Sequence, residues 1–298
     1  MLRPLLQHLS YKSRTRTTGR SMLRPYNLRS MQRLHDTFQR LKQKHERALV
    51  PFVTCGDPDL AMTRDLIRAY DEAGADIIEI GIPFTDPLAD GPTIQRASER
   101  ALANGVTMDD ALNLIADVRS STRCPLVPMT YINPVFQVGY DEFARRCAHV
   151  GADAVIISDL PPEEGADWIA AGRKHNVGTI FLLAPTSDDA RVETVARAAS
   201  GFIYAVARLG VTGARSDVPP EIGELIARIR RHTDTPVCAG FGFSSPDQIR
   251  KTCESSDVDG IVVASALIDK IEKTDGDAHA KIAAGAQMVR ELKAATRK

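Results

Sequence analysis

The stretch Ile77-Ile-Glu-Ile-Gly-Ile-Pro-Phe-Thr-Asp-Pro-Leu-Ala-Asp-Gly-Pro92 joins an apolar, strand-like run to a turn-rich loop. The run, Ile77 to Ile82, contains one acid, Glu79, and the Pro- and Gly-rich loop contains a second, Asp90. Near-continuous apolar strands of this kind are typical of a parallel sheet that is buried on both faces. The stretch therefore predicts one strand of an α/β fold, followed by a loop and a helix.

Apolar, β-branched-rich runs of this kind recur along the chain. There are eight, and most begin 24 to 34 residues apart, the length of one strand plus one helix. They are Leu49 to Thr54, Ile77 to Ile82, Pro125 to Tyr131, Ala154 to Ser158, Gly178 to Leu183, Phe202 to Val206, Pro236 to Ala239 and Gly260 to Val263. The spacing predicts an α/β fold, a single (β/α)8 TIM barrel.

Two further helices are expected beside the regular units. Leu34, Phe38 and Leu41 share one face of a helical pattern that Met31 opens, which predicts an extra N-terminal helix. The long interval between the second and third strands holds helical stretches from Thr93 to Leu102 and from Asp109 to Val118, which predicts an extra helix there. We expect further helices at Pro162 to Lys174, Asp188 to Ala199 and Pro220 to Arg231. No domain boundary is expected within residues 31–298.

Residues 1–30 differ in composition from the rest of the chain. They hold seven Lys and Arg residues, no acid, and many Ser and Thr residues. This composition is typical of an organelle transit peptide. We favour a disordered or artefactually long N-terminal extension over a transit peptide, because Met22 and Met31 are plausible internal starts.

The charge and cysteine content exclude several classes of protein. From Met31 onward the chain has 31 basic and 38 acidic residues, a balance of −7, and no basic stripe with interleaved aromatics, so we expect no nucleic-acid partner. The five cysteines are scattered and odd in number, so neither a set of disulfides nor a zinc site is expected. Free cysteines favour a reducing compartment. No apolar run is long enough to span a bilayer. We expect a cytoplasmic protein, or one of a plastid or other organelle if residues 1–30 are a transit peptide.

Glu79 and Asp90 are the candidate catalytic acids. Glu79 lies among isoleucines, where desolvation favours a protonated carboxyl, whereas Asp90 on its loop can stay ionised. Two carboxyl groups in different environments can act as acid and base at neutral pH. The alternatives are a structural Glu79 paired with Arg or Lys, and an Asp90 that is an ordinary turn residue or caps the helix near Thr93.

Segments of small residues, two of which contain glycine, follow the last three predicted strands. They are Gly210-Val-Thr-Gly213, Gly240-Phe-Gly-Phe-Ser-Ser245 and Ala264-Ser-Ala266. Glycine lets backbone N–H groups approach an anion, and a short helix beginning near Ser265 would direct its positive end at that anion. The segments favour a phosphorylated ligand at the usual phosphate site of such barrels, although each could also be an ordinary turn.

Two other kinds of chemistry lack the residues that they need. None of the eight runs contains a lysine, so a Schiff-base mechanism is not expected. His149, His175 and His232 lie toward helix ends, and we expect no catalytic metal. A different phosphate-binding barrel enzyme, such as a sugar-phosphate isomerase, would explain the glycines but not the two acids.

Four motifs in order carry a resemblance to a known family. They are residues 51–58 (PFVTCGDP), 79–95 (EIGIPFTDPLADGPTIQ), 210–214 (GVTGA) and 240–242 (GFG). In these, residues 31–298 resemble the alpha subunit of tryptophan synthase. The resemblance implies cleavage of indole-3-glycerol phosphate to indole and glyceraldehyde 3-phosphate by retro-aldol chemistry. It also implies no cofactor on this chain, and an α2β2 complex whose beta subunit binds pyridoxal phosphate.

The resemblance also implies roles for individual residues. Glu79 and Asp90 match the two catalytic acids, with Glu79 transferring protons at indole C3 and the glycerol hydroxyl and Asp90 serving the indole nitrogen. Phe52 and Tyr204 match residues that line the indole end of the pocket. The other expected substrate-binding residues are Thr212 in a closing lid, and Gly213, Gly242, Ala264 and Ser265 around the phosphate. Asp86 and Pro87, in the loop Phe84 to Leu88, match the contact surface for the beta subunit.

The chain departs from the family at two places. Ala264 stands where glycine is usual, which could crowd the phosphate but leaves its backbone N–H available. The lid has Ala207-Arg-Leu209 where a serine-containing version is common. Two alternatives stay open: a weakly catalytic or non-catalytic subunit that activates a beta partner, and a stand-alone lyase that releases indole.

Overall fold

The computed structural model of the chain describes residues 30–206 and 220–297. It contains a closed barrel in which each strand pairs in parallel with the next and the last pairs with the first. The strands are β1 Ala48–Thr54, β2 Ile78–Gly81, β3 Leu126–Thr130, β4 Ala154–Ile157, β5 Gly178–Leu183, β6 Ile203–Val206, β7 Val237–Gly240 and β8 Gly260–Val263. Every strand end lies within one residue of the predicted run, so the prediction of a (β/α)8 barrel is confirmed.

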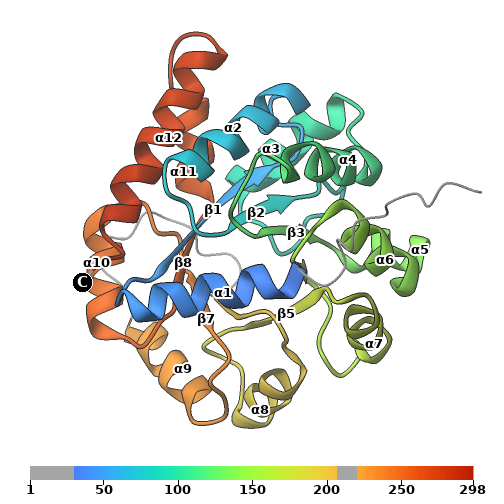
Figure 1. The fold of residues 1–298 in the computed structure, drawn as a ribbon, viewed down its shortest axis with the longest axis vertical. Helices are drawn as coiled ribbons and strands as arrows, with labels where there is room; N and C mark the ends of the chain where they lie inside the picture. The colour runs from blue at the N-terminus through green and yellow to red at the C-terminus, as the bar shows by residue number, and fades with distance from the viewer. Residues whose placement is uncertain (1–29, 207–219, 298) are drawn as a thin grey trace, which may run out of the picture.

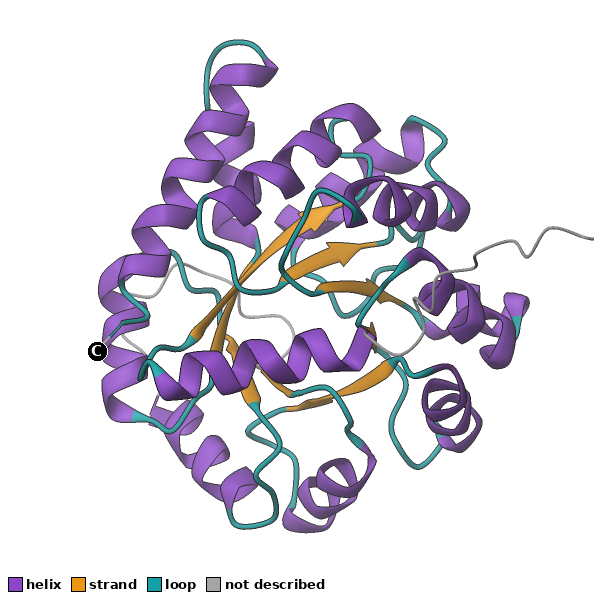
Figure 2. Cartoon of the chain, in the orientation of Figure 1, coloured by secondary structure: helices purple, strands orange, loops and turns teal. Residues whose placement is uncertain are grey.

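Helices surround the barrel in a ring (Figures 1 and 2). They are α1 Ser30–Gln43, α2 Leu60–Glu72, α3 Pro92–Ala103, α4 Met108–Arg119, α5 Ile132–Val138, α6 Tyr140–Val150, α7 Ala166–His175, α8 Asp189–Ala198, α9 Pro220–Arg230, α10 Pro246–Ser255, α11 Ser265–Glu272 and α12 Ala278–Ala294. The extra N-terminal helix is α1, and both α3 and α4 lie between β2 and β3, as predicted. Across the two described ranges, none of the helices combines the length and apolar character needed to cross a membrane.

Two local differences from the sequence prediction have plain causes. The helix expected from Pro162 begins at Ala166, because residues 161–164 form a turn whose Glu164 N–H donates to the Pro161 carbonyl. The short helix α5 was not predicted. It lasts seven residues before Gly139, too short a segment for helical periodicity to be recognised.

Helix α1 crosses the end of the barrel at which the strands begin (Figure 1). Its Leu34, Phe38 and Leu41 pack against the inward-facing side chains of the strands. Arg33 donates to Asp153, just before β4, at 2.8 Å. Arg40 donates to Asp76, just before β2, at 3.2 Å. The helix thus closes the N-terminal end of the barrel and leaves the other end to the ligand.

Candidate active site

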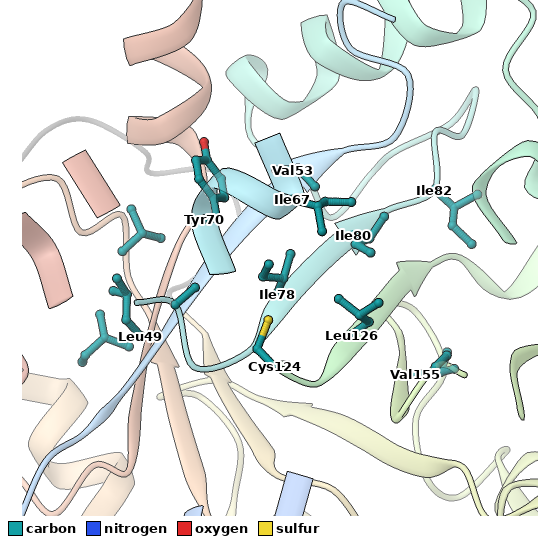
Figure 3. Packing of buried hydrophobic residues seen from close by; sticks show 14 of the residues in the cluster. Leu49, Val53, Ile67, Tyr70, Ile78, Ile80, Ile82, Cys124, Leu126 and Val155 are labelled. Atoms are coloured by element: carbon teal, nitrogen blue, oxygen red, sulfur yellow. The ribbon is translucent and has the colours of Figure 1, made fainter. Parts of the chain in front are cut away.

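The two neighbours of Glu79 in β2 show which way its side chain points. Ile78 and Ile80 belong to the cluster between the barrel and the helices, with Ile67 of α2 (Figure 3). Because successive side chains of a strand point to opposite faces, Glu79 points into the barrel. Its register partner across β1 is Phe52. The strand therefore carries a carboxyl group into an apolar interior.

Burial dominates the electrostatics of Glu79. The residue is 1% exposed, and its Oε2 atom has no hydrogen-bond partner within the described ranges. Burial, and after it the negative charge of Asp90, raises the pKa of Glu79 to about 8. No described lysine or arginine forms an ion pair with it. The described residues thus give no support to the alternative of a structural ion pair, and a carboxyl group with this pKa keeps its proton at neutral pH.

Asp90 lies half-buried on the loop that joins β2 to α3. Its backbone N–H donates to the Pro87 carbonyl at 3.0 Å, and its own carbonyl accepts from Gln95 Nε2 at 2.9 Å. Burial raises the pKa of Asp90 to about 6, against the lowering effect of a hydrogen bond from Tyr131. The residue that caps α3 is Gly91, so Asp90 is not the helix cap that the sequence also allowed.

The two pKa values divide the acid and base roles. Between pH 6 and 8, Glu79 is mostly protonated and Asp90 mostly ionised. A general acid and a general base can then work side by side near neutral pH.

Two aromatic rings line the interior near Glu79, each seated over a glycine of the next strand. A Cβ on Gly81 would lie 2.4 Å from Cζ of Phe52, and a Cβ on Gly240 would lie 2.6 Å from the hydroxyl oxygen of Tyr204. Both glycines leave room for a ring that any larger residue would displace. Burial and then the charge of Glu79 raise the pKa of Tyr204 well above its usual value, so its hydroxyl stays protonated.

Two helices, α10 and α11, begin near the predicted phosphate site. The N-terminal N–H groups of α11 have no side-chain cap, whereas those of α10 do. At α10, Ser245 and Gln248 form a reciprocal capping box. At α11 the cap position is Ala264, and no side chain caps the helix. Because the first N–H groups of a helix lack intrahelical partners, the start of α11 at Ser265 is the better place for an anion.

Of the other residues expected to bind the phosphate group, some lie in the described ranges and some do not. Gly242 has a φ of +74° and open space around it. Ala264 has a φ of −117°, so its side chain causes no backbone strain there. Thr212 and Gly213, with the lid residues 207–209, lie outside the described residues.

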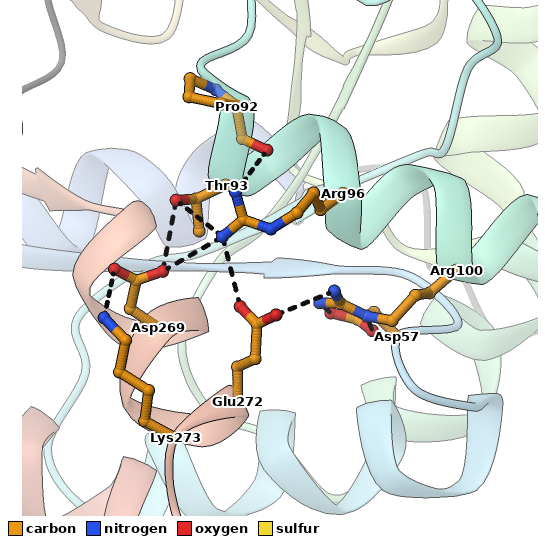
Figure 4. A network of polar contacts seen from close by, with 8 residues as sticks. All are labelled: Asp57, Pro92, Thr93, Arg96, Arg100, Asp269, Glu272 and Lys273. Carbon is orange, nitrogen blue, oxygen red and sulfur yellow. Dashed lines mark hydrogen bonds and ion pairs between the residues drawn. The ribbon is translucent and has the colours of Figure 1, made fainter.

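A network of ion pairs connects α3, which follows Asp90, to α11 (Figure 4). Arg100 donates two hydrogen bonds to Asp57, of 2.7 and 2.9 Å, and forms an ion pair with Glu272 at 3.4 Å. Arg96 also reaches Glu272, at 3.4 Å. The network joins α3 to the second half of α11 and to Asp57 in the loop after β1.

The loop expected to contact the partner, residues 84–88, follows β2 and so lies at the end of the barrel where the strands finish. Asp86 is exposed and accepts from the Thr85 hydroxyl at 2.5 Å, and Pro87 is half-buried. The next residue, Leu88, is 88% exposed, and Phe136 of α5, which follows β3, is 70% exposed. They are the only large hydrophobic residues found exposed in the described parts of the chain.

Three residues near the site were not identified from the sequence. Tyr131 bonds to Asp90, and Gly81 and Gly240 make room for the aromatic rings. Tyr131 closes the third apolar run, and a polar aromatic residue at the carboxyl end of a barrel strand was a usable signal. Gly81 lies within the stretch Ile77 to Pro92, but only the packing shows its contact with Phe52.

The chain matches known proteins over most of its length. The family model described as tryptophan synthase alpha chain matches residues 38–297. A tryptophan synthase alpha chain from Geobacter sp. (strain M21) is 47% identical over 246 residues, covering 83% of this chain and 91% of the relative. One from Desulfosudis oleivorans is 43% identical over 269 residues, covering 90% of this chain and all of the relative.

Solved structures give the same result. An open form of tryptophan synthase from M. tuberculosis has a TM-score of 0.80 at 34% identity, over 89% of this chain and 98% of its own. The alpha subunit from Legionella pneumophila str. Paris has the same TM-score, identity and coverage. The chain therefore belongs to the tryptophan synthase alpha chain family, the lyase of L-tryptophan biosynthesis.

Proposed function

We propose that Glu79 and Asp90 are the acid and the base with which this chain cleaves indole-3-glycerol phosphate to indole and glyceraldehyde 3-phosphate. The observation that carries the proposal is the position of Glu79, which points into the barrel, buried and without a cationic partner among the described residues. A carboxyl group in that state holds a proton that it can give to carbon.

The proton transfers balance when both acids return to their starting states. Protonated Glu79 gives its proton to indole C3 while the Asp90 carboxylate takes the proton from the indole nitrogen, which forms the 3H-indole tautomer. Glu79, now a carboxylate, then takes the proton of the glycerol hydroxyl next to the breaking bond. As the carbon–carbon bond breaks, its electron pair restores the indole ring, the aldehyde forms, and Asp90 returns the proton to nitrogen.

The pocket residues divide between the two ends of the substrate. Phe52 and Tyr204 flank Glu79 inside the barrel and are suited to hold the flat indole ring. The N-terminus of α11, at Ala264 and Ser265, with Gly242 nearby in the loop before α10, is suited to the phosphate. We assign Thr212 and Gly213 to the lid and the phosphate from the family motif alone.

The partner that fits this chain is a tryptophan synthase beta subunit. The alpha chain family pairs with such a subunit, which holds pyridoxal phosphate, and alpha chains have no cofactor of their own. We place the contact at Asp86, Pro87 and the exposed Leu88, and we expect an α2β2 heterotetramer. The bacterial relatives support a cytoplasmic location. The division into residues 1–30 and 31–298 stays a prediction.

An assay of indole release from indole-3-glycerol phosphate tests the catalytic assignment. Glu79→Gln keeps the size of the side chain but cannot transfer the proton, so turnover should fall by about a hundred- to ten-thousandfold. Glu193→Gln, on the exposed face of α8, is the matched control and should leave turnover unchanged. Unchanged indole release by Glu79→Gln would overturn the assignment.

The same assay with a beta subunit separates the two alternatives. A weak turnover that rises steeply only with the beta subunit present would favour an activating subunit with little catalysis of its own. Failure to bind any beta subunit, together with full turnover, would favour a stand-alone lyase.

A further inference from the structure

Tyr131 lies at the carboxyl end of β3, beside the loop that carries Asp90. The residue is buried, and its ring stacks on Phe84 with 5.2 Å between the ring centroids. Its hydroxyl oxygen accepts a hydrogen bond from the backbone N–H of Ala89 at 3.1 Å. The same hydroxyl lies close enough to the Asp90 carboxyl group to lower its pKa. The side chain that directly follows β3 therefore contacts the loop at Phe84 and Ala89 and lies beside Asp90.

The direction of these hydrogen bonds follows from the groups themselves. A backbone N–H can only donate, so the Tyr131 oxygen is the acceptor in its contact with Ala89. The hydroxyl proton is then available for Asp90, whose carboxylate can only accept. Burial, and after it the charge of Asp90, raises the pKa of Tyr131, which keeps this proton in place.

The other contacts of Asp90 restrain its backbone and not its carboxylate. Its N–H bonds to the Pro87 carbonyl, and its carbonyl accepts from Gln95. Among the described residues, the Tyr131 hydroxyl is the polar side-chain group that acts on the carboxylate itself. Its proton can therefore orient the carboxylate from the side of β3.

We propose that Tyr131 is a positioning residue, which anchors the β2–α3 loop to β3 and orients the Asp90 carboxylate for proton exchange with the substrate. The inference rests on the proposed role of Asp90. Because a hydrogen bond from Tyr131 lowers the pKa of Asp90, its loss also leaves less of the base ionised at a given pH.

Tyr131→Phe tests the proposal in the full chain, with indole release measured from pH 5 to 9. The phenylalanine ring preserves the stacking on Phe84 and removes only the hydroxyl. We expect kcat/KM to fall by about ten- to a hundredfold, the effect of one hydrogen bond to a charged group. We also expect the acid limb of the pH profile to move to higher pH. Tyr70→Phe is the matched control, because Tyr70 is another buried tyrosine, lies on α2 outside the barrel, and its hydroxyl has no partner among described residues.

Asp90→Asn separates failure of this inference from failure of the proposed function. If Tyr131 acts through Asp90, adding Tyr131→Phe to Asp90→Asn should change kcat/KM less than twofold. A full loss with Asp90→Asn but an unshifted profile with Tyr131→Phe would overturn the role of Tyr131 alone. No loss with Asp90→Asn would overturn the role of Asp90. Circular dichroism and the melting temperature of each variant show whether a loss of activity comes from unfolding.

Discussion

Glu79 holds its proton because its carboxyl group is buried and none of the residues in the two described ranges offers it a cation. Asp90 is closer to solvent and accepts a hydrogen bond from Tyr131, so its pKa rises less. The difference between the two residues comes from their surroundings, since free Glu and Asp ionise within about half a pH unit of each other.

The pH dependence of kcat/KM should show both groups. Activity should rise as Asp90 ionises, with a limb near pH 6, and fall as Glu79 loses its proton, with a limb near pH 8. Because the two groups interact, the limbs belong to the pair. A profile of indole release that stays flat from pH 5 to 9 under rate-limiting chemistry would contradict both assignments.

Glu79→Gln should be more stable than the wild type at high pH. The folded-state pKa of Glu79 is raised to about 8, so the wild type loses stability as pH rises from about 4.5, where the unfolded carboxyl ionises, to about 8. Glutamine does not ionise, so the variant does not lose this stability. At pH 8 its free energy of unfolding should exceed that of the wild type by roughly 2–4 kcal/mol. Urea titrations at pH 4 and pH 8 measure this, and an equal difference at both values would show that Glu79 ionises normally.

At the scale of elements, loops and helix ends hold the site together. Helix α3 begins directly after Asp90 and Gly91, and α11 begins at the predicted phosphate site. The ion-pair network of Figure 4 joins these two helices and the loop after β1. A displacement of either helix would therefore change the distance between the catalytic loop and the phosphate.

Arg100→Met should show how much this network contributes. The variant loses a two-pronged bond to the mostly buried Asp57 and should lose about 1–3 kcal/mol of stability, with a raised KM for the phosphorylated substrate. Arg145→Met is the matched control, because Arg145 makes a similar two-pronged bond to Glu142 on an exposed surface, and this variant should lose little or no stability. Equal losses in thermal melts of the two variants would show that the network adds nothing beyond a surface pair.

At the scale of the whole molecule, the two ends of the barrel are built for different purposes. The N-terminal end is closed by α1 and by buried acids paired with Arg33, Arg40, Arg119 and Lys293. The other end carries the candidate site, the Asp86–Leu88 loop and exposed Phe136. The two exposed hydrophobic residues at this end are consistent with the contact surface that we propose for a beta subunit.

Phe136→Ser should weaken binding to a beta subunit. Loss of a large interfacial aromatic residue costs about 1–3 kcal/mol, which raises Kd about five- to a hundredfold. Arg197→Ser is the control, because Arg197 is 74% exposed near the end of α8, toward the opposite end of the barrel. Isothermal titration calorimetry with the purified beta subunit measures both, and equal Kd values for Phe136→Ser and Arg197→Ser would move the docking surface elsewhere.

The elements of the fold could be predicted because each depends on local residues. Strand ends were predicted within one residue, since each apolar run is bounded by polar or turn residues. Glu79 and Asp90 could be identified because an acid in an apolar strand and an acid in a glycine-rich loop are both unusual locally. Tyr131, Gly81 and Gly240 could not, because each acts through a residue of a neighbouring strand or its loop.

The sequence by itself determined the order of strands and helices, and it contains the two acids to which we assign the chemistry. The tertiary structure decided what those acids can do. Closure of the barrel removes Glu79 from water, and the approach of β3 brings the Tyr131 hydroxyl to the Asp90 loop. Desolvation and hydrogen bonding act over a few ångströms, so the pKa values exist only once distant segments are packed together.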